Sequence, residues 1–146
     1  MTDDAADQRT RFPGVASGLP ATALGLPGRE RDALTRLALS GTKTSTTSLL
    51  DDYEREHEPV PAAGSRYQLL DSTNRPVAII EVTTVRICRF DEVDLEHAWA
   101  EGEGFETIAD WREAHVASWP HIRARTMVVL ERFRVAERAS TSGLPC

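Results

Sequence analysis

The sequence predicts an α+β fold, in which a few helices interrupt a set of strands. Two segments, Arg66–Leu70 and Val77–Ile87, are rich in β-branched and apolar residues and flank turn-forming residues 71–76, which is typical of an antiparallel hairpin. Apolar and polar residues alternate over Thr126–Ala136, as in a further strand. Helical spacing occurs only in separate short stretches, so repeated strand–helix–strand units are not expected.

Composition and charge narrow the class of protein. The chain has 146 residues, of which 40% are apolar and 27% charged, as in an ordinary globular single domain. Its net charge of −6 argues against tight binding to duplex DNA, because such binding depends on neutralising phosphates. The cysteines and histidines show no zinc-ligand spacing, and no phosphate-cradling glycine loop is present, so neither a metal nor a cofactor is expected.

The start of the chain is acidic and lacks the layout of an export signal, and no segment is long and apolar enough to span a membrane. We therefore expect a cytoplasmic protein. Residues 1–21 are rich in Asp, Ala, Gly and Pro without periodic apolar positions, which is typical of a flexible tail. We expect the folded domain over residues 22–138 and a second tail over 139–146.

The first predicted element of the domain is a helix. Ala33, Leu34, Leu37 and Ala38 recur at helical spacing, and Gly41 lies where a helix commonly ends.

A run of five hydroxyl residues, Thr44–Ser48, follows this helix. Such residues are poor helix formers but can cap a helix, turn or pair as a strand. We expect Gly41–Ser45 to form a loop that leads into a short turn of helix or a strand. Residues 54–65 contain two prolines and a glycine and are expected to form a loop.

Two more helices are predicted between the hairpin and the last strand. The first is short, around Asp94–Ala100, and the second begins at about Thr107 with Asp110 three residues later, close to a capping-box pattern, and runs to about Ser118. The segment Glu101-Gly102-Glu103-Gly104 joins them. Its glycines allow a sharp turn or a close approach to a ligand, on a backbone that carries two carboxylates.

Lys43 is the only lysine among the 17 basic residues of the chain. An ammonium can lose its proton when burial tunes it, whereas a guanidinium cannot near neutral pH. If Lys43 and Thr46 share a helical turn, with β-carbons roughly 5–6 Å apart, the amine can take the hydroxyl proton and make the threonine a nucleophile. The alternative is a solvated turn in which Lys43 offsets the partial charge at the helix C-terminus.

Other side chains are candidates for chemistry or for structure. Glu101 and Glu103 can accept a proton or bind an amine, or simply form an acidic connection between helices. Glu81 lies within an apolar strand and needs a partner if it points inward. Trp111 could stack on a base, but its helical spacing with Trp119 favours core packing.

The pattern Gly-x-Lys-x-x-Thr, formed by Gly41, Lys43 and Thr46, resembles the signature of the ASCH domain family, relatives of the PUA RNA-binding domain, in its longer bacterial branch. The resemblance extends over about residues 22–138. Matching stretches occur in this order: 41–50, 67–90, the corner 90–93, 101–104, Trp111-Arg112 with His115, and 131–133. The resemblance implies a PUA-like fold, a small, partly open β-barrel with flanking helices and a cleft lined by the signature loop.

The resemblance also implies a range of activities. Family members include nucleic-acid-binding modules, ribonucleases and a bacterial branch that hydrolyses the amide of acetylated cytidine. In that branch the base, the nucleophile and the acid correspond to Lys43, Thr46 and Glu103, with Glu101 as a substitute for the acid. Four residues in the matching stretches are expected to contact the substrate: Ser48, Glu101, Trp111 and Arg132. Ser48 stands where the signature has an arginine, so substrate choice need not follow the family.

We therefore expect a protein that binds a nucleobase, a modified nucleoside or single-stranded RNA and can hydrolyse it. The alternatives are a ribonuclease, in which Lys43 stabilises phosphate charge, and a non-catalytic RNA-binding module. Neither a membrane nor duplex DNA is an expected partner, and the sequence does not predict an oligomeric state.

Overall fold

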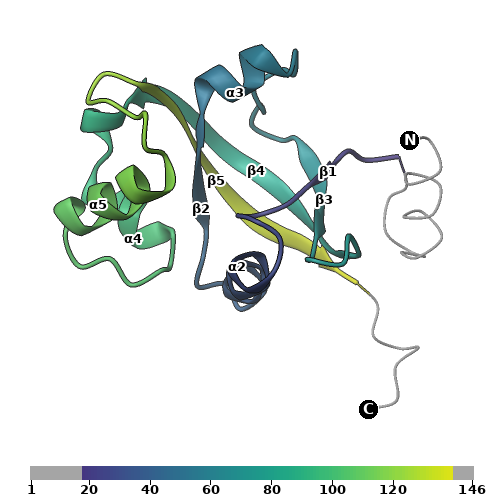
Figure 1. Ribbon diagram of the computed structural model, residues 1–146. Helices are drawn as coiled ribbons and strands as arrows, with labels where there is room; N and C mark the ends of the chain where they lie inside the picture. The colour runs from purple at the N-terminus through teal and green to yellow at the C-terminus, as the bar shows by residue number, and fades with distance from the viewer. Residues whose placement is uncertain (1–17, 140–146) are drawn as a thin grey trace.

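The computed structural model describes residues 18–139, which form a five-stranded mixed sheet flanked by helices (Figure 1). The strand order is β1-β3-β4-β5-β2, in which β1 is parallel to β3 and the other neighbours are antiparallel. The predicted α+β class is confirmed, and the sheet is not closed. In chain order the elements are β1 (Ala21–Thr22), α2 (Arg29–Leu39), β2 (Ser45–Leu49), α3 (Leu50–Arg55), β3 (Arg66–Leu70), β4 (Pro76–Arg89), the 3-10 helix η1 (Phe90–Glu92), α4 (Leu95–Ala100), α5 (Ile108–Ser118) and β5 (Met127–Arg138).

Most of the two predicted tails lies outside the described residues. The described chain nevertheless contacts the sheet before residue 22, where the domain was predicted to begin. The backbone N–H of Gln68 on β3 donates to the carbonyl of Pro20 at 2.8 Å, and its side-chain amide donates to the carbonyl of Leu19 at 2.9 Å. No helix within residues 18–139 has the length and hydropathy needed to cross a membrane.

Local sequence accounts for where the helices begin and end. Gly41 follows α2 with a φ of 83°, a conformation that glycine adopts without strain. Asp94 caps α4 by accepting from the backbone N–H of His97, and Thr107 caps α5 by accepting from that of Asp110. The predicted helices are therefore confirmed, and so are the hairpin strands on either side of residues 71–75.

The run of hydroxyl residues forms the edge strand β2, which pairs with β5. Side chains alternate between the two faces of a strand. Ser45 and Thr47 accordingly face α4, whereas Thr46 and Ser48 face the opposite side of the sheet. The assumption that Lys43 and Thr46 share a helical turn was therefore wrong, because the hydroxyls pair with β5 as a strand instead.

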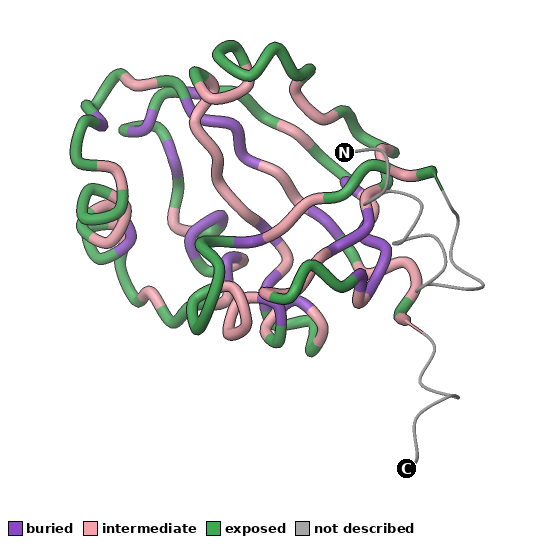
Figure 2. The backbone as a smooth tube through the Cα atoms, turned by 45° about the vertical axis from the view of Figure 1, so that its right-hand side comes forward, coloured by how far each residue is buried: buried purple, intermediate pink, exposed green. Residues whose placement is uncertain are grey.

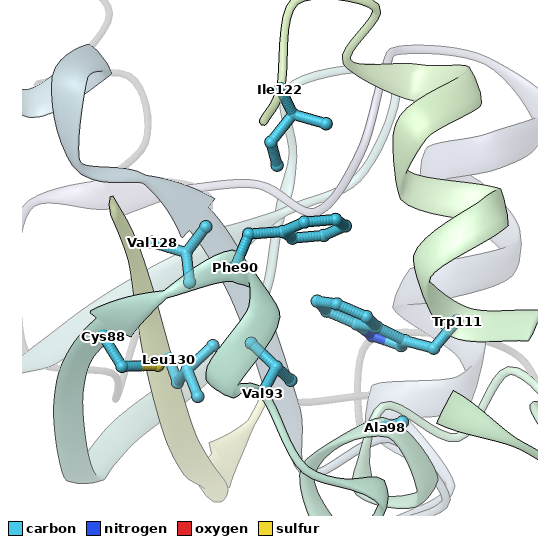
Figure 3. Packing of buried hydrophobic residues seen from close by; sticks show 8 residues of the cluster. All are labelled: Cys88, Phe90, Val93, Ala98, Trp111, Ile122, Val128 and Leu130. Atoms are coloured by element: carbon cyan, nitrogen blue, oxygen red, sulfur yellow. The ribbon is translucent and has the colours of Figure 1, made fainter. Parts of the chain in front are cut away.

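Each face of the sheet carries an apolar cluster, and buried residues follow the strands and the helices that meet them (Figure 2). One cluster lies between the sheet, α4 and α5, where Trp111 packs against Phe90 with ring centroids 5.3 Å apart (Figure 3). The other lies on the α2 side and includes Ala38, Leu69 and Phe133. Both clusters include residues of β4 and β5, whereas β2 presents polar residues on both of its faces.

Candidate functional site

The loop before β2 is fastened to the segment that follows α4. The backbone N–H of Thr44 donates to the carbonyl of Ala100 at 2.7 Å, and the Ser45 hydroxyl donates to the carbonyl of His97 at 3.0 Å. Gly102 lies so close to this loop that a β-carbon would be 2.5 Å from the Thr42 carbonyl oxygen. The glycine predicted to allow a close approach thus approaches the chain's own backbone.

Lys43 is buried in this junction, with 3% of its surface exposed. Its Nζ donates to the Glu101 carbonyl at 3.4 Å and pairs with Glu103 Oε2 at 3.4 Å. Burial raises the pKa of Glu103 above its ordinary value, and the charge of Lys43 offsets this only in part. The fold therefore brings Lys43 together with the two glutamates that the sequence singled out.

The Glu101 carboxylate is the centre of a buried polar cluster. It accepts from the Thr47 hydroxyl at 2.5 Å, and its oxygens lie 3.2 Å from His97 Nε2 and 3.5 Å from His115 Nε2. Burial alone would raise the pKa of Glu101, but hydrogen bonds from both histidines and the charge of Lys43 outweigh burial and hold it well below its ordinary value. Glu101 is therefore an ionised anchor.

Trp111 positions His115 in this cluster. The two rings stack with centroids 4.1 Å apart, and His115 Nδ1 lies 2.7 Å from the Trp111 carbonyl. Burial alone would lower the pKa of His115, but the hydrogen bond and charge of Glu101 outweigh it and raise that pKa. A charged His115 donates from both nitrogens, one to Glu101 and one to the Trp111 carbonyl.

Thr46 and Ser48 line a separate cleft, of about 210 Å³, between the two edge strands β1 and β2. The cleft exists because the sheet curls without closing, so that its edges face each other across a gap. Tyr53 of α3, Tyr67 of β3 and Glu131 of β5 contribute polar groups to its walls. Its apolar lining includes Leu24, Ile80 and Phe133.

Glu131 is the half-buried acid of this cleft, directly across the strands from Thr46. The Tyr53 hydroxyl donates to Glu131 Oε2 at 3.4 Å. Burial raises the pKa of Glu131 above its ordinary value, and burial also raises the pKa of Tyr53 to about 12. No arginine, lysine or histidine within residues 18–139 lines this cleft.

The structure places the other predicted site residues apart from the cleft. Lys43 makes no hydrogen bond with Thr46 within the described chain and lines a different cleft, of about 260 Å³, beside Arg134. Trp111 is 0% exposed and belongs to the core, which leaves no surface for a ligand. Arg132 points to the face opposite Thr46, where it pairs with Glu96 at 3.2 Å.

Sequence reasoning missed the contributions of Tyr53, Tyr67, Glu131 and His97. His97 could have been found from the sequence, because it lies four residues before Glu101 and this spacing places two side chains on the same face of a helix. The three missed residues of the cleft, Tyr53, Tyr67 and Glu131, come from three different elements, and no regular spacing relates them. Within residues 18–139, no three His, Cys, Asp or Glu side chains are arranged to hold a metal ion.

The close contact at Gly102 leads to a first prediction. Gly102 and Gly104 both have positive φ, at 72° and 88°, so alanine at either position is strained, but only at Gly102 would the new β-carbon meet backbone atoms. We expect Gly102→Ala to lower the free energy of unfolding by about 1–3 kcal/mol more than Gly104→Ala. Urea denaturation of both variants measures this difference, and equal losses would contradict the contact.

A second prediction concerns the pH dependence of stability. The pKa of Glu131 is raised in the folded state. The stability that its protonated side chain contributes is therefore fully present below the unfolded pKa, about 4.3, and is lost as pH rises through the folded pKa. Glutamine cannot ionise, so Glu131→Gln should become more stable relative to the wild type between pH 4 and pH 8. Urea denaturation at both pH values checks this, and a constant difference in stability would rule it out.

Comparisons with known proteins agree with the architecture. A crystal structure of a protein from Enterococcus faecalis V583 matches with a TM-score of 0.78 at 26% identity, covering 99% of this chain and 95% of that chain. An ASCH domain from Lactobacillus crispatus JV V101 matches with a TM-score of 0.77 at 25% identity, covering 94% of this chain and 97% of that chain. No curated protein matches the chain. The ASCH domain model matches residues 22–137. The chain therefore belongs to the ASCH domain family, whose PUA-like fold is associated with binding of RNA and other nucleic acids.

Proposed function

We propose that this ASCH domain binds a nucleobase, as a modified nucleoside or within single-stranded RNA, in the cleft between β1 and β2. The supporting observation is the lining of that cleft, which combines the rings of Tyr53 and Tyr67 with the hydroxyls of Thr46 and Ser48. Aromatic rings stack on bases, and hydroxyl and carboxyl groups hydrogen-bond with base edges. The family association with nucleic acids favours the same ligand class.

The charge of the cleft indicates which part of a nucleotide enters it. Glu58 and Glu131 line the cleft, and no basic side chain of residues 18–139 does so. A phosphate placed there would lose hydration without gaining a counter-charge, which is costly. In this proposal the base and sugar occupy the cleft, and the phosphates of an RNA strand remain outside it.

The test is binding of ribonucleosides, acetylated cytidine and short single-stranded RNA to the full chain by isothermal titration calorimetry. We expect Tyr67→Ala to weaken binding about 5- to 100-fold, because stacking on one aromatic ring contributes about 1–3 kcal/mol per base. Tyr67→Phe keeps the ring and should bind like the wild type. Trp99→Ala removes an aromatic residue that is 59% exposed outside the cleft and serves as the control. Unchanged binding by Tyr67→Ala would contradict the proposed site.

A second candidate function is hydrolysis of the amide of acetylated cytidine, and the pairing of Lys43 with Glu103 favours it. In this candidate Lys43 first gives its proton to Glu103, and the neutral amine then takes the hydroxyl proton as the Thr46 oxygen attacks the acetyl carbon. Glu103 then donates a proton to the leaving amine as the C–N bond breaks, and water cleaves the acetyl-threonine ester. Because Lys43 and Thr46 are not hydrogen-bonded here, movement of the loop before β2 on substrate binding is part of this candidate.

Lys43→Arg separates this candidate from a ribonuclease. Arginine keeps the positive charge but does not accept a proton near neutral pH. We expect at least a 100-fold loss of deacetylation, about the lower limit of a general base contribution, as followed by chromatography of the released cytidine. Retained deacetylation would remove Lys43 as the base. Cleavage of single-stranded RNA that survives Lys43→Arg would instead support the ribonuclease, in which Lys43 acts only through its charge.

A further inference from the structure

A second cleft, of opposite charge, adjoins the cleft between β1 and β2. Its volume is about 260 Å³, and it lies against β5 where α2 ends and the chain enters β2. Three of its lining side chains are basic, Lys43, Arg134 and Arg138, and no acidic side chain within residues 18–139 lines it. We call it the cationic cleft. The charged side chains that line the cleft between β1 and β2 are, in contrast, both glutamates.

The two arginines of the cationic cleft carry positive charge that is only partly compensated within the described chain. Arg134 lies 3.2 Å from Glu81, but Glu81 already pairs with Arg66 at 2.9 Å. Arg138 donates to the Leu39 carbonyl at the end of α2, a favourable place for a cation that nevertheless supplies no full negative charge. Positive charge is therefore in excess beside this cleft.

Both arginines keep hydrogen-bond donors for a ligand. A guanidinium carries five N–H donors in a rigid, planar fork, and within the described chain Arg134 and Arg138 each use one nitrogen, for Glu81 and Leu39 respectively. This fork matches the oxygens of a phosphate group and can bind two of them at once. The ammonium of Lys43 is turned to Glu101 and Glu103, so no contact with the ligand is assigned to it.

The two clefts lie next to each other along β2 and β5. Phe133 lines both of them, whereas Thr44 lines the cationic cleft and Thr46 lines the other. The contact with β5 extends back to Thr44, whose carbonyl accepts from the Phe133 backbone N–H at 3.0 Å. Positions two residues apart along a strand are separated by about 6.6 Å. One nucleotide can therefore reach both clefts, with its base in one and its phosphate in the other.

We propose that the cationic cleft binds a phosphate group of the nucleotide whose base occupies the cleft between β1 and β2, and that Arg134 and Arg138 contact it. This inference rests on the proposed function, because a base in the neighbouring cleft is what identifies the anion as a phosphate. The phosphate gains here the counter-charge that the acidic cleft does not offer. A chain with a net charge of −6 can thus hold a nucleotide, because its positive charge is gathered where the phosphate lies.

A ribonucleoside and its 5′- and 3′-monophosphates form a matched set of ligands, because they differ only in the phosphate group. We expect the wild type to bind one of the two monophosphates about 10- to 100-fold more tightly than the nucleoside, as measured by isothermal titration calorimetry. This advantage should shrink as the salt concentration rises, because salt screens charges at an open site.

Arg134→Gln and Arg138→Gln should each reduce the advantage of the monophosphate about 5-fold or more, since glutamine keeps an amide donor but loses the charge. Arg134→Gln leaves Glu81 paired with Arg66, so that ion pair of the sheet is retained. Arg125→Gln is the control, because Arg125 is exposed and lines neither cleft. Circular dichroism of each variant checks that the fold is intact.

The same variants are titrated with short single-stranded RNA to identify the source of the phosphate. Weaker binding of RNA identifies a phosphodiester of a strand, and a loss confined to the monophosphates identifies a free nucleotide; either result supports the site. If no nucleoside and no monophosphate binds the wild type, both the proposed function and this inference fail. If nucleosides bind but their monophosphates bind no more tightly, or if the advantage survives both arginine substitutions, base binding stands and the phosphate site is overturned.

Discussion

The buried charge of Lys43 is the constraint on which the site depends. A buried ammonium is tolerated only when it is paired and hydrogen-bonded. Here its partners, the Glu101 carbonyl and the Glu103 carboxylate, follow α4, nearly sixty residues along the chain. This pairing, together with the close contact at Gly102, fastens the loop before β2 to the helical side of the molecule. The edge strand β2, which pairs with β5, is thereby fixed at its start.

Fixing β2 determines what each of its hydroxyls does. Because side chains alternate along a strand, Thr47 faces the Glu101 cluster, while Thr46 faces the cleft. A register shift of one residue would turn Thr47 toward the cleft and would place Ser48 against the buried carboxylate. The pairing of Thr46 with Glu131 is thus a consequence of the register that the Lys43 loop helps to set.

The sequence predicted helices α2, α4 and α5, the hairpin strands and the family, because caps, turn residues and the Gly-x-Lys-x-x-Thr signature are local patterns. It also singled out Lys43, Glu101 and Glu103, which the fold brings together. It did not predict that Thr46 would face away from them, because the hydroxyl run was compatible with helix and strand alike. The family resemblance implied a cleft at the signature loop, but the other walls of the cleft were beyond sequence reasoning, since they include an edge strand that meets β2 only when the sheet curls.

Glu101 and Glu131 lie on opposite sides of β2, and their surroundings shift their pKa values in opposite directions. Glu101 is the more deeply buried, yet two histidines and Lys43 keep it ionised. Glu131 is less buried, but phenol and hydroxyl groups surround it, and burial raises its pKa despite the hydrogen bond from Tyr53. The presence of neighbouring cations, rather than the depth of burial, therefore explains why the pKa of Glu101 is lowered and that of Glu131 is raised. An ionised glutamate suits anchoring of the loop, whereas one that is more readily protonated can also donate a hydrogen bond in the cleft.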